Sequence, residues 1–343
     1  MRLLLAASFI CLFAVPATPA DPPVAPPADK DKVKMDDQTK AAVEKALKWL
    51  KDQQNADGSW GSTTKTAMTS FALLAFMANG HVPNQGNYGP EVSKGIRYLL
   101  SCSRDSDGYL LGPSGGNMYC HGMAALALTQ AFGMTGDEDV KKVLKKAIEL
   151  IVKTQNHEGG WRYDPSPTGA DISVTIMQVM ALRGAKDSGL HVPDKTIKNA
   201  IEYIDKCYDK RSGGYRYQPY SSGPGYARTA AGVCVIYLGG EEEINKHDKD
   251  ELRKAIEYME RMGDDNAHYW YGHYYAAHAL NQVGGEIWEK YYDRMKTTLL
   301  PRQKASGEWY EPRREAAYGP VYQTAIAVLI LSVPSHYLPI YQK

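Results

Sequence analysis

Three stretches of the chain decide the fold: QNADGSW at 54–60, QNHEGGW at 155–161 and QKASGEW at 303–309. Each fits the pattern Q-x3-G-x-W. Glycine suits a left-handed residue at a helix end, where the chain reverses. The Trp can pack on the neighbouring turn, and the Gln amide can reach unpaired groups at a helix end. The stretches therefore predict turns between helices, fastened by Gln54, Gly58 and Trp60, by Gln155, Gly159 and Trp161, and by Gln303, Gly307 and Trp309.

Weaker copies of this turn complete a repeat. DGY at 107–109, GGY at 213–215 and the lone Trp270 are the degenerate copies. Charged segments with apolar residues at i, i+1, i+3 and i+4 lie near 43–50, 95–99, 147–151, 200–204 and 255–259, with a weaker copy at 295–300. That spacing places one apolar stripe on a helix. A unit of about 50 residues is therefore repeated six times.

An uncharged segment follows each amphipathic one. The stretches 66–80, 117–136, 172–182, 229–240, 269–285 and 316–333 contain no Asp, Glu, Lys or Arg. Helices apolar around most of their circumference must be enclosed, and single repeats cannot bury them, so the repeats must stack. We predict an all-α (α/α)6 double-layered barrel, or toroid, of six helical hairpins over 37–343. An open solenoid is the competing arrangement. Closure is favoured because the inner helices lack the charges of a solvated concave face.

The recurring Q-x3-G-x-W turns resemble the repeats of squalene–hopene cyclases and protein prenyltransferase β subunits, over roughly residues 40–332. The resemblance implies toroid packing, with the turns as structural fasteners. The acidic D-x-D-D cluster of such cyclases is missing, because 105–107, 137–139 and 264–265 read as turns or helix caps. The prenyltransferase zinc pattern is missing as well, since Ser173 stands where Asp-x-Cys would need a thiolate. We expect neither chemistry, no cofactor and no bound metal.

One constellation remains, at the mouth where the N-terminal ends of six parallel inner helices gather. Free N–H groups and the positive end of the helix dipole favour an anionic ligand there. His, Tyr, Asp and Arg can supply acid–base or charge-stabilising groups. The catalytic candidates are His121, Asp171, Tyr226, Arg228 and His273. The ligand-binding candidates are Asn117, Tyr119, Ser173, Trp270, Tyr318 and Tyr322.

Each candidate also has a structural interpretation. Asp171 can be a helix N-cap, His121 a satisfied buried histidine, and Arg228 with Asp171 a buried ion pair. Cys120, His121 and Asp171 are residue types that can bind zinc, but their order along the chain differs from that of the zinc ligands in the family.

Three functions follow from the mouth. The first is a toroid that binds a small molecule, a glycan or a protein partner there without the family's chemistry. The second is a terpenoid cyclase-like enzyme whose acid is displaced to Asp171. The third is a secreted polysaccharide lyase or hydrolase. The pocket wall separates them, because it would be apolar for a terpenoid and polar for a glycan.

The N-terminal residues predict export. Arg2, the apolar run 3–15 and the small residue Ala20 are typical of a signal peptide over 1–20. A Pro-rich disordered leader follows at 21–36. With 40 basic and 39 acidic residues the chain has no excess to neutralise phosphates, so we expect no nucleic-acid partner, and no transmembrane span after cleavage. In an exported chain a Cys102–Cys120 disulfide becomes possible.

Overall fold

Two concentric layers of helices form the protein. The computed structural model describes residues 33–221, 223–263 and 267–341. The outer helices are α1 (Asp37–Asp52), α3 (Gly89–Ser101), α5 (Glu138–Thr154), α7 (Asp194–Lys206), α10 (Lys249–Met262) and α12 (Gly285–Leu299). The inner helices are α2 (Lys65–Met77), α4 (Met118–Thr135), α6 (Ile172–Asp187), α8 (Tyr226–Leu238), α11 (Tyr269–Val283) and α13 (Gly319–Ser332). The short α9 (Glu241–Lys246) and four 3-10 turns complete the helices of the described residues.

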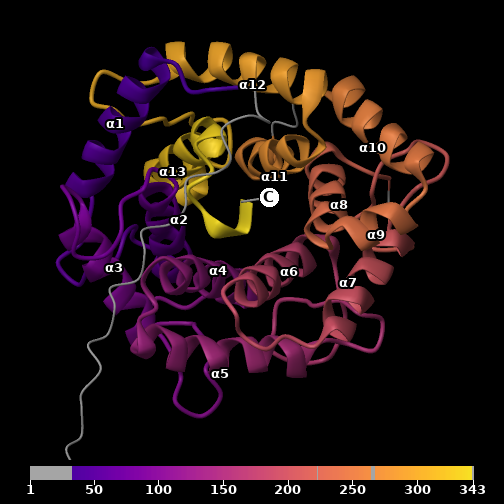
Figure 1. Ribbon diagram of the computed structural model, residues 1–343, viewed down its shortest axis with the longest axis horizontal. Helices are drawn as coiled ribbons and strands as arrows, with labels where there is room; N and C mark the ends of the chain where they lie inside the picture. The colour runs from indigo at the N-terminus through magenta and orange to yellow at the C-terminus, as the bar shows by residue number, and fades with distance from the viewer. Residues whose placement is uncertain (1–32, 222, 264–266, 342–343) are drawn as a thin grey trace, which may run out of the picture.

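The inner layer is a closed ring, as Figure 1 shows. Each inner helix contacts the next in the order α2, α4, α6, α8, α11, α13, and α13 packs back on α2. The first outer helix, α1, covers the last inner helix, α13. Strands are absent from the described residues, which contain only two isolated β-bridges. The predicted closed toroid of six hairpins is confirmed, and an open solenoid is excluded.

The three full turns lie between an outer helix and the next inner helix, and each buries its Trp ring. The indole Nε1 of Trp60, Trp161 and Trp309 donates to the carbonyl of Leu50, Ile151 and Leu299, at 2.6, 2.8 and 2.8 Å. These carbonyls belong to the last turn of the preceding outer helix, where backbone acceptors lack intrahelical donors. The Trp residues therefore fasten the two helices of a hairpin.

The Gln and Gly of each turn bind the next outer helix. Gln303 Nε2 donates to Ala42 O at 2.8 Å, which joins the sixth repeat to the first. Gln54 and Gln155 make the equivalent bonds to Glu91 O and Thr196 O. Gly159 has a φ of +103°, and a Cβ there would lie 2.1 Å from Asn199 O. Only glycine allows this approach.

The C-terminal segment lies across the barrel at the C-terminal ends of the inner helices, and in Figure 1 its yellow ribbon lies inside the ring. Leu338 and Ile340 are buried there, and Ile340 N donates to Gln130 Oε1 at 3.1 Å. Residues 316–335 are long and apolar enough to cross a membrane, but 72% of the most apolar window is buried inside the toroid. This segment contains the sixth inner helix, α13.

The expectation about the disulfide changes, whereas the predicted signal peptide and leader stay predictions. The thiols of Cys102, Cys120, Cys207 and Cys234 are all free and buried, so the expected Cys102–Cys120 disulfide is wrong. Thr66 Oγ1 instead donates to Cys102 Sγ at 3.6 Å. Residues 1–32, which hold the expected signal peptide and most of the leader, lie outside the described residues. The end of that leader packs on the toroid, with Ser335 Oγ donating to Met35 Sδ at 2.9 Å.

Candidate functional site

The N-terminal ends of the inner helices are capped by the protein itself. Met118 N donates to Tyr163 O at 2.9 Å, and Ile172 N donates to Tyr217 O at 3.0 Å. Trp270 N donates to the Glu315 carboxylate at 2.6 Å. The N–H groups that were expected to face an anionic ligand are therefore used, and two carboxylates, of Asp171 and Glu315, lie among them. The mouth does not offer the predicted anion site.

Asp171 lies at the centre of this mouth as the N-cap of α6. Its Oδ1 accepts from Ser173 N and Val174 N, both at 3.0 Å, as the cap interpretation predicts. Its side chain is fully buried, and Oδ2 makes no hydrogen bond of normal length with a described residue, although the Tyr217 hydroxyl lies close enough to act on the carboxyl as a hydrogen-bond donor. Burial raises the pKa of Asp171, and the Val174 amide and the nearby Tyr217 hydroxyl only partly oppose this. One buried carboxyl oxygen thus remains open to a hydrogen-bond partner.

Tyrosine side chains surround this carboxyl. Tyr163 OH and Tyr217 OH are 2.6 Å apart, and Tyr163 is 38% exposed. The Tyr119 and Tyr163 rings have centroids 6.1 Å apart. Burial raises the pKa of Tyr119 and of Tyr217, and the nearby Asp171 charge raises both further. The phenols therefore stay protonated at neutral pH and can donate as well as accept hydrogen bonds.

Rings from α11 fill much of the barrel interior below the mouth. Tyr271 OH donates to Ser173 O at 3.2 Å, and Tyr275 OH donates to Met177 Sδ at 3.0 Å, so both reach α6 past α8. Tyr274 meets Phe71 of α2 edge to face at 6.0 Å. These side chains cross between helices that are not neighbours in the ring. They therefore fill space inside the barrel, and the mouth is the part of the interior that they leave for a ligand.

His121 does not belong to the mouth. Its Nδ1 accepts from Leu110 N at 3.0 Å, and its Nε2 lies 3.1 Å from Ala147 O of α5. The ring is fully buried between α4 and the outer layer, and burial lowers its pKa to about 4. His121 is thus a neutral structural histidine, and the expected catalytic placement is wrong. Both ring nitrogens are in use, so it cannot join Cys120 and Asp171 around zinc.

His273 and Tyr226 also face the outer layer. His273 Nδ1 lies 3.1 Å from Tyr226 OH and 3.0 Å from the hydroxyl of Tyr291 on α12. All three side chains are buried. Trp270 is fully buried too and packs edge to face on Tyr269, so it cannot serve as an exposed sugar platform. These residues hold α8, α11 and α12 together, and the predicted convergence of the five catalytic candidates fails.

Arg228 and the remaining candidates lie nearer to the mouth. Arg228 is half-buried beside Gly225 and forms no ion pair with Asp171, so the expected bridge between them is not made. Asn117 caps α4 by accepting from Tyr119 N at 2.9 Å. Tyr322 OH donates to Glu315 Oε1 at 3.0 Å, and the 52% exposed Tyr318 packs on the Tyr322 ring.

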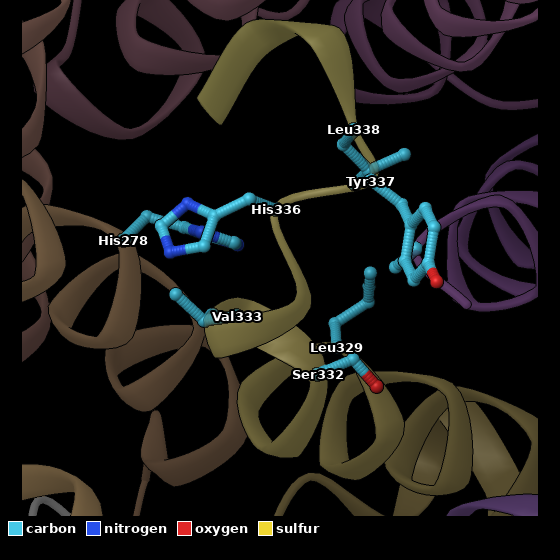
Figure 2. Close-up of a pocket in the computed structure, with 8 residues that line it drawn as sticks. His278, Leu329, Ser332, Val333, His336, Tyr337 and Leu338 are labelled. Carbon is cyan, nitrogen blue, oxygen red and sulfur yellow. The ribbon is translucent and has the colours of Figure 1, made fainter. Parts of the chain in front are cut away.

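Four residues of the site were not predicted: Tyr163, Tyr217, Tyr271 and Glu315. Two of them carry a signal in the sequence, because WRY at 161–163 and YRY at 215–217 repeat an aromatic residue two positions after the ring of the turn. The opposite end of the barrel offers no comparable site. Figure 2 shows His278, His336 and Tyr337 around a pocket of only about 10 Å³, room for at most one water. The described residues contain no group of three His, Cys, Asp or Glu that could hold a metal ion.

Comparison with known proteins agrees with this architecture. Drimenyl diphosphate synthase of Streptomyces showdoensis is 26% identical over 195 residues, which make up 55% of this chain and 34% of that protein. The chain thus matches about a third of that relative's length. Among solved structures, the type II terpene cyclase MstE of Scytonema has a TM-score of 0.60 at 14% identity, over 89% of this chain and 100% of that one. An α-1,6-mannanase of Salegentibacter, solved with α-1,6-mannotriose, has a TM-score of 0.66 at 10% identity, over 88% and 100%.

Similarity at such low identity shows the fold alone. The family evidence comes from the sequence. A model described as the prenyltransferase alpha-alpha toroid domain matches residues 32–162 and 173–273, more than half of the chain. The chain therefore belongs to the prenyltransferase α-α toroid family.

Proposed function

We propose that the protein is an exported toroid that binds an uncharged, hydroxyl-rich ligand of the glycan class at the mouth around Asp171. The observation that carries the proposal is the buried Oδ2 of Asp171, which makes no hydrogen bond of normal length with a described residue. The nearby hydroxyl is that of Tyr217, which is also bonded to the hydroxyl of Tyr163 at 2.6 Å. Buried polar atoms are nearly always satisfied, so an unsatisfied one beside the exposed ring of Tyr163 favours a partner that the chain itself does not supply. A ligand hydroxyl can supply the missing hydrogen bond.

The surroundings of Asp171 favour a neutral ligand. The carboxyl groups of Asp171 and Glu315 repel an anion, and the helix N–H groups that would attract one are capped. The phenols of Tyr119, Tyr163 and Tyr217 combine a flat apolar face with a hydroxyl, as suits a sugar ring with its C–H faces and hydroxyl rim. The exposed rings of Tyr163 and Tyr318 can extend the contact to further sugar units.

Polyprene cyclisation fits the interior less well. The side chains of Tyr271, Tyr275 and Tyr274 occupy space that a long hydrocarbon would need. The sequence also lacks the D-x-D-D cluster and the zinc pattern, so the binding proposal relies on neither motif. The mannanase neighbour, solved with a mannotriose, supports a glycan on this fold by analogy only.

The test is titration of the full chain with α-1,6-mannotriose and cellobiose, followed by NMR chemical shifts and calorimetry. Asp171→Asn is the first variant, because Asn also caps helices well and the fold should persist. Tyr163→Phe is the second, because the exposed phenol of Tyr163 is one of the proposed sugar contacts. We expect each to weaken binding at least tenfold, about 1.4 kcal/mol. Asp194→Asn, an exposed aspartate at the start of α7, is the matched control and should change nothing. Equal affinity of Asp171→Asn and the unaltered protein would remove the proposed site.

A second function rests on the raised pKa of Asp171. A carboxyl that keeps its proton to higher pH, among aromatic rings, is a candidate general acid for a terpenoid cyclase-like reaction. Incubation with a polyprenyl diphosphate, with product analysis by mass spectrometry, tests this function. A cyclised product that Asp171→Asn abolishes would replace the binding proposal with this one, and an unchanged substrate would reject it.

Export is the remaining part of the proposal and is supported by residues 1–20. Cell fractionation of the tagged full chain is the measurement. We expect a mature product that begins near Asp21 outside the cytoplasm, and an uncut cytoplasmic chain would contradict it.

A further inference from the structure

Among the described residues, the junction between α10 and α12 shows no glycine fastener of the kind that the other junctions have. At the other five, a glycine of the turn packs against the backbone or Cβ of one residue on the next outer helix. The pairs are Gly58 with Lys94, Gly108 with Lys146, Gly159 with Asn199, Gly213 with Lys254, and Gly307 with Lys45. Each contacted residue precedes a Gly or Ala, namely Gly95, Ala147, Ala200, Ala255 or Ala46. Small residues there allow the close approach.

The equivalent position on α12 is Arg294. Lys45 and Lys146 each precede by five residues the carbonyl that accepts a Trp indole, those of Leu50 and Ile151, and Arg294 has the same spacing to Leu299. However, Arg294 is followed by the large Met295, and residues 258–270 contain no Q-x3-G-x-W. Gly263, the described glycine after α10, has no atom within 4 Å of the place of a Cβ, so it does not pack on Arg294.

A crevice of about 190 Å³ occurs at this junction. Its walls are apolar side chains of α10, α11 and α12: Ile256, Met259, Leu280 and Ile287. Its floor includes the phenol rings of Tyr226 and Tyr291, whose hydroxyls bind His273. Charged side chains of both signs complete the lining, namely Glu260, Lys290 and Arg294. The crevice is independent of the mouth around Asp171.

We propose that this crevice binds a small zwitterion with an apolar body, of the class of a free hydrophobic amino acid such as phenylalanine. An apolar cavity of about 150 Å³ holds one benzene molecule, so 190 Å³ holds a ring with one or two further carbons. A benzyl side chain has that size. The aliphatic and aromatic walls provide the apolar surroundings that such a side chain needs.

The charges around the crevice complement a zwitterionic head. Lys290 matches a carboxylate, and the exposed Glu260 matches an ammonium group. Lys290 is paired with Glu286 at 2.8 Å, but both side chains are more than 70% exposed. Such a surface pair is weak and exchanges readily for a ligand carboxylate. Arg294 lies over the Tyr291 ring at 5.5 Å, which holds its charge beside the floor.

Four probes that share the phenyl ring test the head group: phenylalanine, 3-phenylpropanoate, phenethylamine and 3-phenylpropanol. Each is titrated into the full chain, with methyl NMR signals of Ile256, Met259 and Ile287 as the readout. We expect phenylalanine to bind at least tenfold more tightly than each of the other three. Equal affinity of all four would overturn the charge argument, and the absence of shifts at these methyl groups would overturn the site.

Substitutions locate the binding. Ile287→Trp should fill the crevice and weaken phenylalanine binding at least tenfold. Glu260→Gln and Lys290→Gln should each weaken phenylalanine binding several-fold. They test the site even if the larger side chain of Ile287→Trp disturbs folding. Glu289→Gln, on the same helix but outside the crevice, and the exposed Lys142→Gln are matched controls. Unchanged affinity in the three crevice variants would reject the proposal, and a circular-dichroism melt confirms that each variant is folded.

Discussion

Replacement of Gly159 by alanine tests whether the turns fasten the toroid through a close approach that only glycine permits. The new Cβ would lie 2.1 Å from Asn199 O and 2.6 Å from Asn199 C. Both are backbone atoms of α7, so a side-chain movement cannot relieve the overlap. Gly189 provides a matched control, since its φ is +81° and a Cβ there meets nothing within 4 Å.

The two substitutions share the backbone strain and differ in the clash. A left-handed conformation costs alanine about 1–2 kcal/mol, and the smaller conformational freedom of its unfolded chain returns about 0.4–1. We therefore expect Gly189→Ala to lower the free energy of unfolding by about 1 kcal/mol. Overpacking against fixed backbone adds about 1–3 kcal/mol. The loss for Gly159→Ala should then be about 3 kcal/mol.

Equilibrium urea unfolding, followed by circular dichroism, measures both variants beside the unaltered protein. The midpoint of Gly159→Ala should fall well below that of Gly189→Ala at a similar slope. Hydrogen exchange should also increase most at the α5–α7 junction in Gly159→Ala. Equal losses in the two variants would refute the argument, because the glycine would then be required only for its φ.

Three further perturbations probe the same architecture. Trp161→Ala should lower the free energy of unfolding by about 3–5 kcal/mol. Trp161→Phe mainly loses the indole hydrogen bond to Ile151 O and should lower it by about 1–3 kcal/mol. A loss below about 1 kcal/mol for Trp161→Ala would mean that the ring does not fasten the turn. Burial lowers the pKa of His121 from 6.5 to about 4, so its stabilisation is complete above pH 6.5 and is lost as the pH falls toward 4, by about 3 kcal/mol. Unfolding of His121→Gln across this range should show a correspondingly smaller pH dependence, and an unchanged one would contradict the assignment. Leu338→Ala should lower the free energy of unfolding by about 2–4 kcal/mol if the C-terminal segment is an integral part of the barrel, whereas an unchanged calorimetric melt would show that it is a loose tail.

The sequence predicted the architecture because two strong patterns agree. Uncharged helices alternate with amphipathic ones, and the turns around Trp60, Trp161 and Trp309 recur in register. Each pattern depends on local backbone geometry, namely helix periodicity and the conformational range of glycine, so it can be recognised without knowledge of the tertiary structure. Closure was predicted from the missing charges, and α13 does pack on α2.

The candidate site was predicted only in part. Asp171, Ser173 and Tyr119 do lie at the mouth, whereas His121 and His273 face the outer layer. An inner helix is enclosed on every side, so its sequence has no polar stripe to tell the interior of the barrel from the layer between the helices. The rotation of each inner helix is set by tertiary packing. The same ambiguity explains why Tyr271, which reaches α6, was not selected.

The position of α1 over α13 has a consequence for how the chain acquires its structure. The bond from Gln303 to Ala42 O joins residues separated by 261 positions. During synthesis α1 is the first of these helices to leave the ribosome, whereas α13, on which it packs in the folded protein, is the last. Until both helices have been made, the apolar stripe of α1 is not covered by α13. A contact between residues so far apart in the sequence also forms slowly. A chain that is cut short before α13 therefore leaves uncovered the surfaces of α1, α2 and α11 on which α13 packs, and is prone to associate with other chains.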